Sequence, residues 1–242
     1  MRKSLRKREN RKLKCNVPAN FSVEKARLIQ LELSKKIVKE DVFSKEVKYV
    51  AGVDVAYTNG KAVGAVAVFD FPLLSRVEVK TAIVENRFPY IPTLLSFREL
   101  HPTLSAIKKL SESPDVYLVD GHGLAHPYRL GFASHLGLIL KKPTIGVAKS
   151  LLYGKVVKTP KKVGEATLIY DNEEVIGAVL LTKEKRKPIY VSIGHMISLE
   201  TAIEIVKGCI REYRIPEPIR AAHLAANELK RKIVQEYQSE IS

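Results

Sequence analysis

Three acidic residues, Asp54, Glu99 and Asp120, are candidates for a metal-binding site. Asp54 stands in the middle of a valine-rich segment, where alternation places it on the same strand face as the small residues Gly52 and Ala56. A carboxylate flanked in this way has open space above it, and a buried charge is costly unless it is paired or bound to a metal. The alternative for Asp54 is a structural ion pair with a lysine on a helix.

Asp120 and Glu99 are weaker candidates when each is taken alone. Asp120 ends a short apolar segment and opens a glycine-rich loop over residues 120–127. The carboxyl ends of parallel strands face the binding crevice in open α/β sheets, but an aspartate followed by a glycine is also ordinary turn chemistry. Glu99 is on a predicted helix, where a single glutamate usually faces solvent.

The elements around Asp54 predict an antiparallel meander. Residues 47–57, 61–71 and 74–84 are rich in valine and alternate with a period of two, which is typical of strands. Asn59-Gly60 lies between the first two segments and predicts a tight hairpin turn, because both turn positions need positive φ. A helix is predicted before the meander, over residues 22–40, with Ser22 as its N-cap.

Helices and short strands alternate after the meander. Helices are predicted over residues 93–112, 130–140, 199–211 and 218–237, and strands over residues 116–119, 144–147, 166–170, 175–181 and 189–193. Pro102 is expected to kink or divide the first of these helices. Short apolar strands separated by helices imply parallel pairing with right-handed crossovers. We therefore expect an α/β fold with a mixed central sheet, an antiparallel three-stranded meander plus parallel strands, and helices on both faces.

This topology is expected to bring the three acids together. The helix that carries Glu99 is predicted to pack across the strands that carry Asp54 and Asp120. Three close carboxylates repel one another unless divalent cations neutralise them, and hard oxygen ligands select Mg²⁺ or Mn²⁺ over zinc. Beside a basic cleft, such a site is suited to phosphodiester hydrolysis, in which the cations activate water and stabilise the leaving oxygen.

The charge distribution indicates a polyanionic partner. The chain has 41 Lys and Arg residues against 26 Asp and Glu residues, a net charge of +15. Residues 1–14 carry a net +7, and residues 121–164 carry eight basic residues and no acid, so the remainder is neutral. A field concentrated in a tail and one internal segment suits nucleic acid. The alternative, a lysine-rich surface of the thermophile type, would mix in glutamate.

Length and composition set the class of protein. A chain of 242 residues with 45% hydrophobic residues can bury a large core. Its longest apolar runs are far shorter than the roughly 20 residues of a membrane span, and its N-terminus has no apolar signal region. Two cysteines, Cys15 and Cys209, are too few for a disulfide framework. We expect a cytoplasmic protein with a basic, flexible N-terminal arm over residues 1–20 and a single domain over residues 21–242.

Three longer motifs resemble the signature of the endonuclease V family, the inosine-directed repair nucleases. They are residues 88–99 (FPYIPTLLSFRE), residues 119–127 (VDGHGLAHP) and residues 143–150 (PTIGVAKS). Together with Gly52-Val53-Asp54, they extend the resemblance over roughly residues 50–223, in order and with matching spacing. The resemblance implies a ribonuclease H-like fold, which agrees with the strand order read from the sequence.

The resemblance also assigns roles to individual residues. It implies a metal site built from Asp54 and Asp120, with Glu99 completing the acidic cluster, and a strand-separating wedge made of Pro89, Tyr90, Ile91 and Pro92. It implies a pocket for a flipped base around Leu95, Gly121, Gly146 and Ala148. Lys149 is expected at the scissile phosphate or the pocket rim, His126 in the same cleft, and His223 near the metals for proton transfer or phosphate contact. The remaining candidates, His101, His135 and His195, are expected to be structural.

Two positions depart from the family pattern. Thr93 stands in the wedge segment where family members often have glycine, which predicts a stiffer loop. Tyr128 stands where arginine is frequent, which removes an expected phosphate contact. The basic residues at positions 1–14 are a candidate replacement, although they lie outside the resemblance.

The expected function is Mg²⁺-dependent cleavage of DNA that contains deoxyinosine, with Mn²⁺ as a substitute cation. The resemblance implies hydrolysis of the second phosphodiester bond 3′ to the lesion, leaving 3′-hydroxyl and 5′-phosphate ends. The substrate is expected to be double- or single-stranded DNA, and the enzyme a monomer with no membrane partner. Two alternatives stay open: an endoribonuclease that acts on inosine in RNA, and a nucleic-acid-binding protein without catalysis. Intact Asp54, Glu99 and Asp120 argue against the second.

Overall fold

The computed structural model describes residues 21–43 and 46–241. Its helices are α1 (Val23–Ser34), α2 (Leu95–Ile107), α3 (Phe132–Leu140), α4 (Leu199–Gly208) and α5 (Glu217–Ile241). Its strands are β1 (Tyr49–Thr58), β2 (Lys61–Asp70), β3 (Arg76–Glu85), β4 (Val116–Asp120), β5 (Thr144–Ala148), β6 (Lys155–Val156), β7 (Ala166–Asp171), β8 (Glu174–Leu180) and β9 (Ile189–His195). The predicted basic arm, residues 1–20, lies outside the described residues.

The strands of the described part of the chain form one mixed sheet in the order β3-β2-β1-β4-β5-β9-β8-β7-β6. The predicted meander is confirmed, since β1 pairs with β2 and β2 with β3 in antiparallel register. Asn59 and Gly60 both have positive φ, as the hairpin turn requires. The predicted parallel pairing is also confirmed, since β4 lies between β1 and β5 and is parallel to both. The short strand β6 was not predicted.

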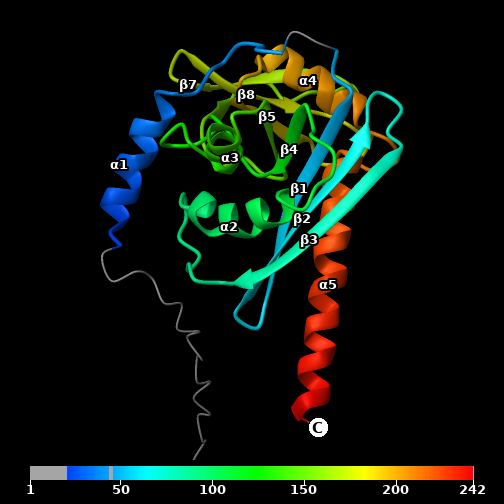
Figure 1. Ribbon diagram of the computed structural model, residues 1–242. Helices are drawn as coiled ribbons and strands as arrows, with labels where there is room; N and C mark the ends of the chain where they lie inside the picture. Colours follow the sequence, from blue (N-terminus) through cyan, green and yellow to red (C-terminus); the bar gives the residue numbers. More distant parts are fainter. Residues whose placement is uncertain (1–20, 44–45, 242) are drawn as a thin grey trace, which may run out of the picture.

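Helices cover both faces of the sheet (Figure 1). One core lies between the sheet and the helices α2 and α3, and contains Val53, Val119 and Phe132. The core of the other face holds Ala56 together with residues of α4 and α5, such as Val206 and Ala222. Strand alternation therefore divides β1 as predicted, with Val53 facing α2 and α3. Among the described residues, no helix is both long enough and apolar enough to cross a membrane.

The placement of α2 differs from the sequence prediction. This helix packs mainly against β2 and β3, rather than across β1 and β4. The reason is Gly64 on β2, where a side chain would overlap the backbone carbonyl of Pro102. Pro102 was expected to kink or divide this helix, and it does not divide it, since one helix runs from Leu95 to Ile107 with Pro102 inside it. The missing side chain of Gly64 lets the middle of α2 settle directly on the meander.

Helix α5 makes an equally close approach on the other face. A side chain at Gly52 of β1 would overlap the backbone of Pro218 and Ile219, at the start of α5. The sequence prediction of open space above Asp54 is therefore only partly right, because α5 occupies the space on the Gly52 side. The close contact holds the start of α5 directly against β1.

We expect Gly52→Ala to destabilise the protein by about 1–3 kcal/mol, because the new methyl group overlaps backbone atoms that cannot rotate away. The measurement is the urea midpoint at constant slope. The matched control is Gly208→Ala, whose added carbon meets only the ring of Phe71 at 2.8 Å. That ring can move, and alanine favours the helix, so the control should be neutral or mildly stabilising. Equal effects of the two substitutions would contradict this account of α5.

Candidate active site

Asp54 and Asp120 lie side by side because β1 and β4 pair in parallel. Val53 is in register with Val119, so the next residue on each strand is one of the two acids. One ligand atom from each carboxylate and one ring nitrogen of His223 lie within 4.8 Å of one another. Three such atoms are close enough to share a cation, and their chemistry suits a divalent ion that accepts oxygen and imidazole ligands.

Each of the two acids also contacts a basic side chain from another element. His223 on α5 places Nδ1 at 2.6 Å from Oδ2 of Asp54. Asn227, one helical turn later, donates a hydrogen bond of 2.9 Å to the carbonyl oxygen of His223. Lys149, directly after β5, places Nζ at 2.5 Å from Oδ2 of Asp120. The structure thus brings together both acids, His223 and Lys149, which the sequence had assigned to one site.

Glu99 approaches the acids from α2 and is only 8% exposed. The hydroxyl of Tyr57 donates a hydrogen bond of 3.3 Å to its Oε1, and the guanidinium of Arg98 lies 3.8 Å from the centre of the Tyr57 ring. Burial, followed by the charges of Asp54 and Asp120, raises the pKa of Glu99 to about 8. Burial and the charge of Asp120 likewise raise the pKa of Asp54. Without a cation, the cluster therefore resists carrying its full negative charge.

A pocket of about 310 Å³ adjoins this cluster. Its lining includes Asp120 and Lys149, together with Leu95, Gly121 and Ala148 of the expected base pocket. Gly146 does not line it. A side chain at Gly146 would overlap the backbone of the loop from Gly121 to Gly123, so this glycine lies beneath that loop and supports it.

The wedge segment forms the mouth of the same pocket. Tyr90 lines the pocket and is 66% exposed. The start of the segment is anchored by Phe88, whose ring lies 4.9 Å from that of Phe21 and 6.2 Å from that of Phe97. Tyr90 thus presents an exposed ring beside the pocket, in a segment whose preceding residue Phe88 packs against two other rings.

His126 braces the wedge segment against the second motif. It is 3% exposed, and burial lowers its pKa to about 4, so the ring is neutral at physiological pH. Its Nδ1 accepts a hydrogen bond from the N–H of Tyr128, so Nε2 carries the proton and donates to the carbonyl of Thr93 at 3.0 Å. Both ring nitrogens are thus engaged within the fold, and His126 also lines the pocket, in the cleft where it was expected.

Thr93 is held in an unfavourable backbone conformation at this point. Its φ of +73° lies in the left-handed region, which costs a β-branched residue roughly 1–2 kcal/mol. The same carbonyl that accepts from His126 also accepts a hydrogen bond of 2.8 Å from the buried side chain of Gln30 on α1. This explains why glycine suits the position, and it shortens α2, which begins at Leu95 rather than at Thr93.

Helix α1 also reaches the other departure from the family pattern. Arg27 places its guanidinium 5.5 Å from the centre of the Tyr128 ring. Gln30, on the same helix, donates to the carbonyl of Leu130 as well as to that of Thr93. The positively charged side chain of Arg27 therefore lies beside Tyr128, where the family pattern would place an arginine. It does so without any contribution from residues 1–14.

His101, His135 and His195, which were expected to be structural, make no hydrogen bond or ion pair with Asp54, Glu99 or Asp120 within the described part of the chain. His135 is buried, contacts Ser96 at 3.1 Å and has its pKa lowered to about 4 by burial. His195 is buried and accepts a hydrogen bond of 3.2 Å from the N–H of Val38, and His101 is exposed on α2.

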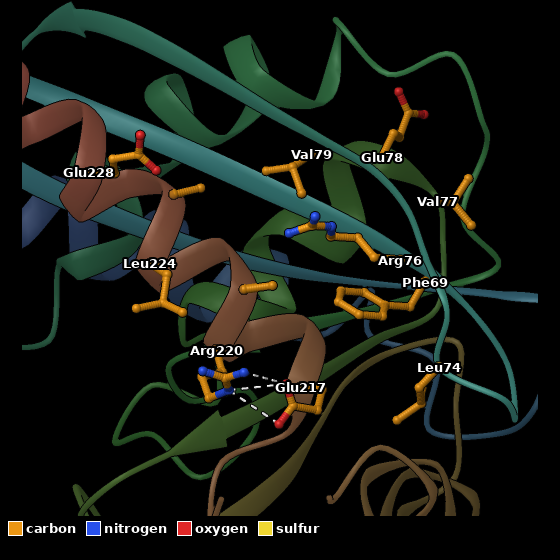
Figure 2. Close-up of a pocket in the computed structure, with 12 residues that line it drawn as sticks. Phe69, Leu74, Arg76, Val77, Glu78, Val79, Glu217, Arg220, Leu224 and Glu228 are labelled. Atoms are coloured by element: carbon orange, nitrogen blue, oxygen red, sulfur yellow. Dashed lines mark hydrogen bonds and ion pairs between the residues drawn. The ribbon is translucent and has the colours of Figure 1, made fainter. Parts of the chain in front are cut away.

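A separate cavity of about 890 Å³ lies between β3 and α5, where Arg220 pairs with Glu217 (Figure 2).

Several residues of the site were not predicted from the sequence. Tyr57 alternates with Val53 and Val55, which gave no sign of its contact with Glu99. Gln30 looks like an ordinary polar residue of an amphipathic helix, yet it is completely buried. His122 contacts the carbonyl of Ser150 at 3.0 Å and so joins the second and third motifs. These partners come from distant segments, and only the tertiary fold reveals them.

Known proteins resemble this chain over most of its length. The endonuclease V family profile matches residues 31–224. Endonuclease V of Rippkaea orientalis is 49% identical over 220 residues, which cover 90% of this chain and 96% of the relative. The crystal structure of endonuclease V from Bacillus subtilis is 33% identical, covers 90% of this chain and 96% of its own, and superposes with a TM-score of 0.83.

A third relative was crystallised with nucleic acid. Endonuclease V of Ciona intestinalis is 37% identical, covers 88% of this chain and all of its own, and superposes with a TM-score of 0.77. Its crystals contain a 23mer DNA with an inosine followed by a ribo-adenosine. The mixed sheet with helices on both faces is thus a ribonuclease H-like fold, as the sequence predicted. The chain belongs to the endonuclease V family.

Proposed function

We propose that this protein is a DNA repair endonuclease that recognises deoxyinosine and hydrolyses the second phosphodiester bond 3′ to it. The products are 3′-hydroxyl and 5′-phosphate ends, and the required cation is Mg²⁺, with Mn²⁺ as a substitute. The observation that carries the proposal is the convergence of Asp54, Asp120 and His223 beside a pocket with Tyr90 at its mouth. The inosine-containing DNA bound to the Ciona relative supports this choice of lesion.

The cation is proposed to bind Asp54 and Asp120, with Glu99 completing the acidic cluster. A bound divalent ion supplies an activated water and stabilises charge on the leaving oxygen. The contact with Asp54 orients the His223 ring, which suits it to move a proton or to contact a phosphate. Lys149 contacts Asp120 and is close enough to the site to exchange that contact for one with the scissile phosphate.

The pocket is proposed to hold the flipped hypoxanthine base. Gly121 and Ala148 let the backbone approach a planar base closely, and Leu95 packs against its face. Hypoxanthine carries a carbonyl at position 6 where adenine carries an amino group, so backbone N–H donors favour it. Guanine carries a further amino group, which a small pocket excludes. Tyr90 fills the gap that the base leaves, and this compensates for the cost of unstacking.

The setting of the protein is part of the same proposal. We infer a monomer that acts in the cytoplasm on double- or single-stranded DNA. Supporting observations are the net charge of +15, and Cys209, which is buried and free of any disulfide.

We expect Asp54→Asn and Asp120→Asn each to lower the rate of nicking at inosine at least about a hundredfold, because each removes a charge that holds the cation. Binding of the inosine strand should persist, because the pocket and the wedge are unchanged. The measurement is single-turnover cleavage of a labelled inosine duplex in Mg²⁺, with an adenine duplex and excess chelator as controls. Chelator-resistant cleavage would refute the proposed cation, and loss of binding together with unfolding would make these acids structural.

The same assay separates the alternatives. Matched strands with a single deoxyinosine or a single riboinosine show whether DNA or RNA is the better substrate. Faster cleavage of the RNA strand would replace the proposed function with that of an endoribonuclease. Binding of both strands without cleavage of either would identify a nucleic-acid-binding protein.

We expect Tyr90→Ala to weaken binding of the inosine strand roughly 5- to 150-fold, the range that corresponds to about 1–3 kcal/mol for one stacked base. The ring is exposed, so thermal stability should change little. The control is Tyr237→Ala, which removes an exposed ring on α5. Equal effects of the two substitutions on binding would refute the wedge.

We expect Glu99→Gln to stabilise the cation-free protein at pH 8 but not at pH 4.5. The folded chain holds this proton up to a pKa of about 8, whereas the ordinary value is 4.5. The contribution of protonated Glu99 to the stability of the wild-type protein is therefore fully present below pH 4.5 and is lost as the pH rises from 4.5 to 8. Glutamine does not ionise, so the variant keeps its stability over this range. With one pKa unit worth about 1.4 kcal/mol, the gain at pH 8 is on the order of 2–4 kcal/mol.

The measurement is the melting temperature of both proteins against pH in chelator. The control is Glu32→Gln, because Glu32 is 70% exposed. A gain for Glu99→Gln of the same size at both pH values would show that packing rather than charge is responsible.

A further inference from the structure

A basic surface adjoins the acidic cluster and shares Lys149 with the base pocket. It is a groove of about 950 Å³ between the β8–β9 loop and the segment that joins α4 to α5. Five of its lining residues are basic and two are acidic: Lys149, Lys183, Arg186, Arg214 and Arg220 against Glu184 and Glu212. We call this surface the basic groove.

The basic groove and the base pocket meet at the acids. Lys149 lines both cavities, and His223 lines the groove while its ring contacts Asp54. A strand whose flipped base occupies the pocket and whose scissile phosphate lies at the acids therefore continues toward the groove. Because the proposed cleavage is 3′ to the lesion, the part of the strand that enters the groove is the part 3′ to the cut.

The walls of the groove are fixed by hydrogen bonds. Thr182 donates from Oγ1 to the carbonyl oxygen of Arg214 at 2.8 Å, and Arg214 donates from Nη1 to the carbonyl oxygen of Lys187 at 2.9 Å. Tyr213 is 50% exposed, and Arg220 lies 4.2 Å from the centre of its ring. A fixed groove that combines cationic side chains with an exposed aromatic ring suits a nucleic-acid strand, whose phosphates and bases need these two kinds of contact.

The other large cavity lacks this charge pattern. The cavity between β3 and α5 carries three carboxylates, from Glu78, Glu217 and Glu228, against the cations of Arg76 and Arg220 (Figure 2). Its lining is thus net negative and repels a polyanion. Of these two cavities, the basic groove is the one whose charge suits a polyanionic strand.

We propose that the basic groove binds the cleaved strand on the 3′ side of the scissile bond, with its phosphates on Lys183 and Arg186 and a base against Tyr213. This inference rests on the proposed function. Lys183 is half-buried and Arg186 exposed, and within the described residues neither makes a hydrogen bond or ion pair that holds the fold together. Both side chains are therefore free to contact phosphate.

The test uses the full chain in chelator and two single strands that share one inosine. The long strand continues past the proposed scissile phosphate, and the short strand ends at it with a 3′ phosphate. The salt dependence of binding is measured as the slope of log K against log salt concentration. For the long strand, the double variant Lys183→Gln/Arg186→Gln should lower the magnitude of this slope by about 1.4, because each of the two lost phosphate contacts removes about 0.7. The slope for the short strand should not change.

The matched control is Arg231→Gln/Lys232→Gln, which removes two exposed cations on α5 that do not line the basic groove. It should change neither slope. Equal changes on both strands, or no change on the long strand, would overturn the groove. Equal affinity of the wild-type protein for inosine and adenine strands would instead refute the proposed function, so the two failures are distinguishable.

Discussion

The main physical constraint on this structure is the electrostatic repulsion between three carboxylates that the fold holds close together. Parallel pairing of β1 with β4 places Asp54 beside Asp120, and α2 adds the buried Glu99. Burial in a medium of low polarity makes each charge costly and strengthens the repulsion between them. His223 and Lys149 offset part of this cost, each through one contact. A divalent cation would neutralise the remaining repulsion. The free energy by which the repulsion destabilises the cation-free protein would then contribute to the affinity of the site for the cation.

The rigid contacts of the fold serve to keep this cluster in place. Gly52 lets α5 approach β1, and this places His223 on Asp54. Gly146 lies beneath the loop after Asp120, and His126 joins that loop to the wedge segment. Each of these contacts links backbone to backbone or to a neutral side chain, so none of them depends on the charge of the cluster. The acids can therefore change protonation or bind a cation while the surrounding framework stays in place.

Local pattern was sufficient to predict the meander, the parallel strands and the pairing of the two aspartates, because alternation and turn residues are properties of short segments. It was not sufficient for α2, whose position depends on the missing side chain of Gly64 opposite Pro102. Local pattern also missed the partner of Glu99, because Tyr57 is 42 residues away along the chain. The sequence did not show that Gly146 lies beneath the loop from Gly121 to Gly123 and not in the lining of the pocket, because residue type and motif do not tell whether a small residue faces a cavity or supports a loop.

Thr93 shows how one departure from a family pattern is accommodated. Its left-handed backbone would favour glycine, yet its carbonyl accepts hydrogen bonds from Gln30 and His126, and these hold the conformation. The cost of the strained residue is thus met by contacts to α1 and to the second motif. Because Tyr90 lies three residues earlier in the same segment, the strain also restricts the wedge. Under the proposed function, a stiffer wedge loses less entropy on insertion, so Thr93 would favour a ring that is already placed for binding before DNA arrives.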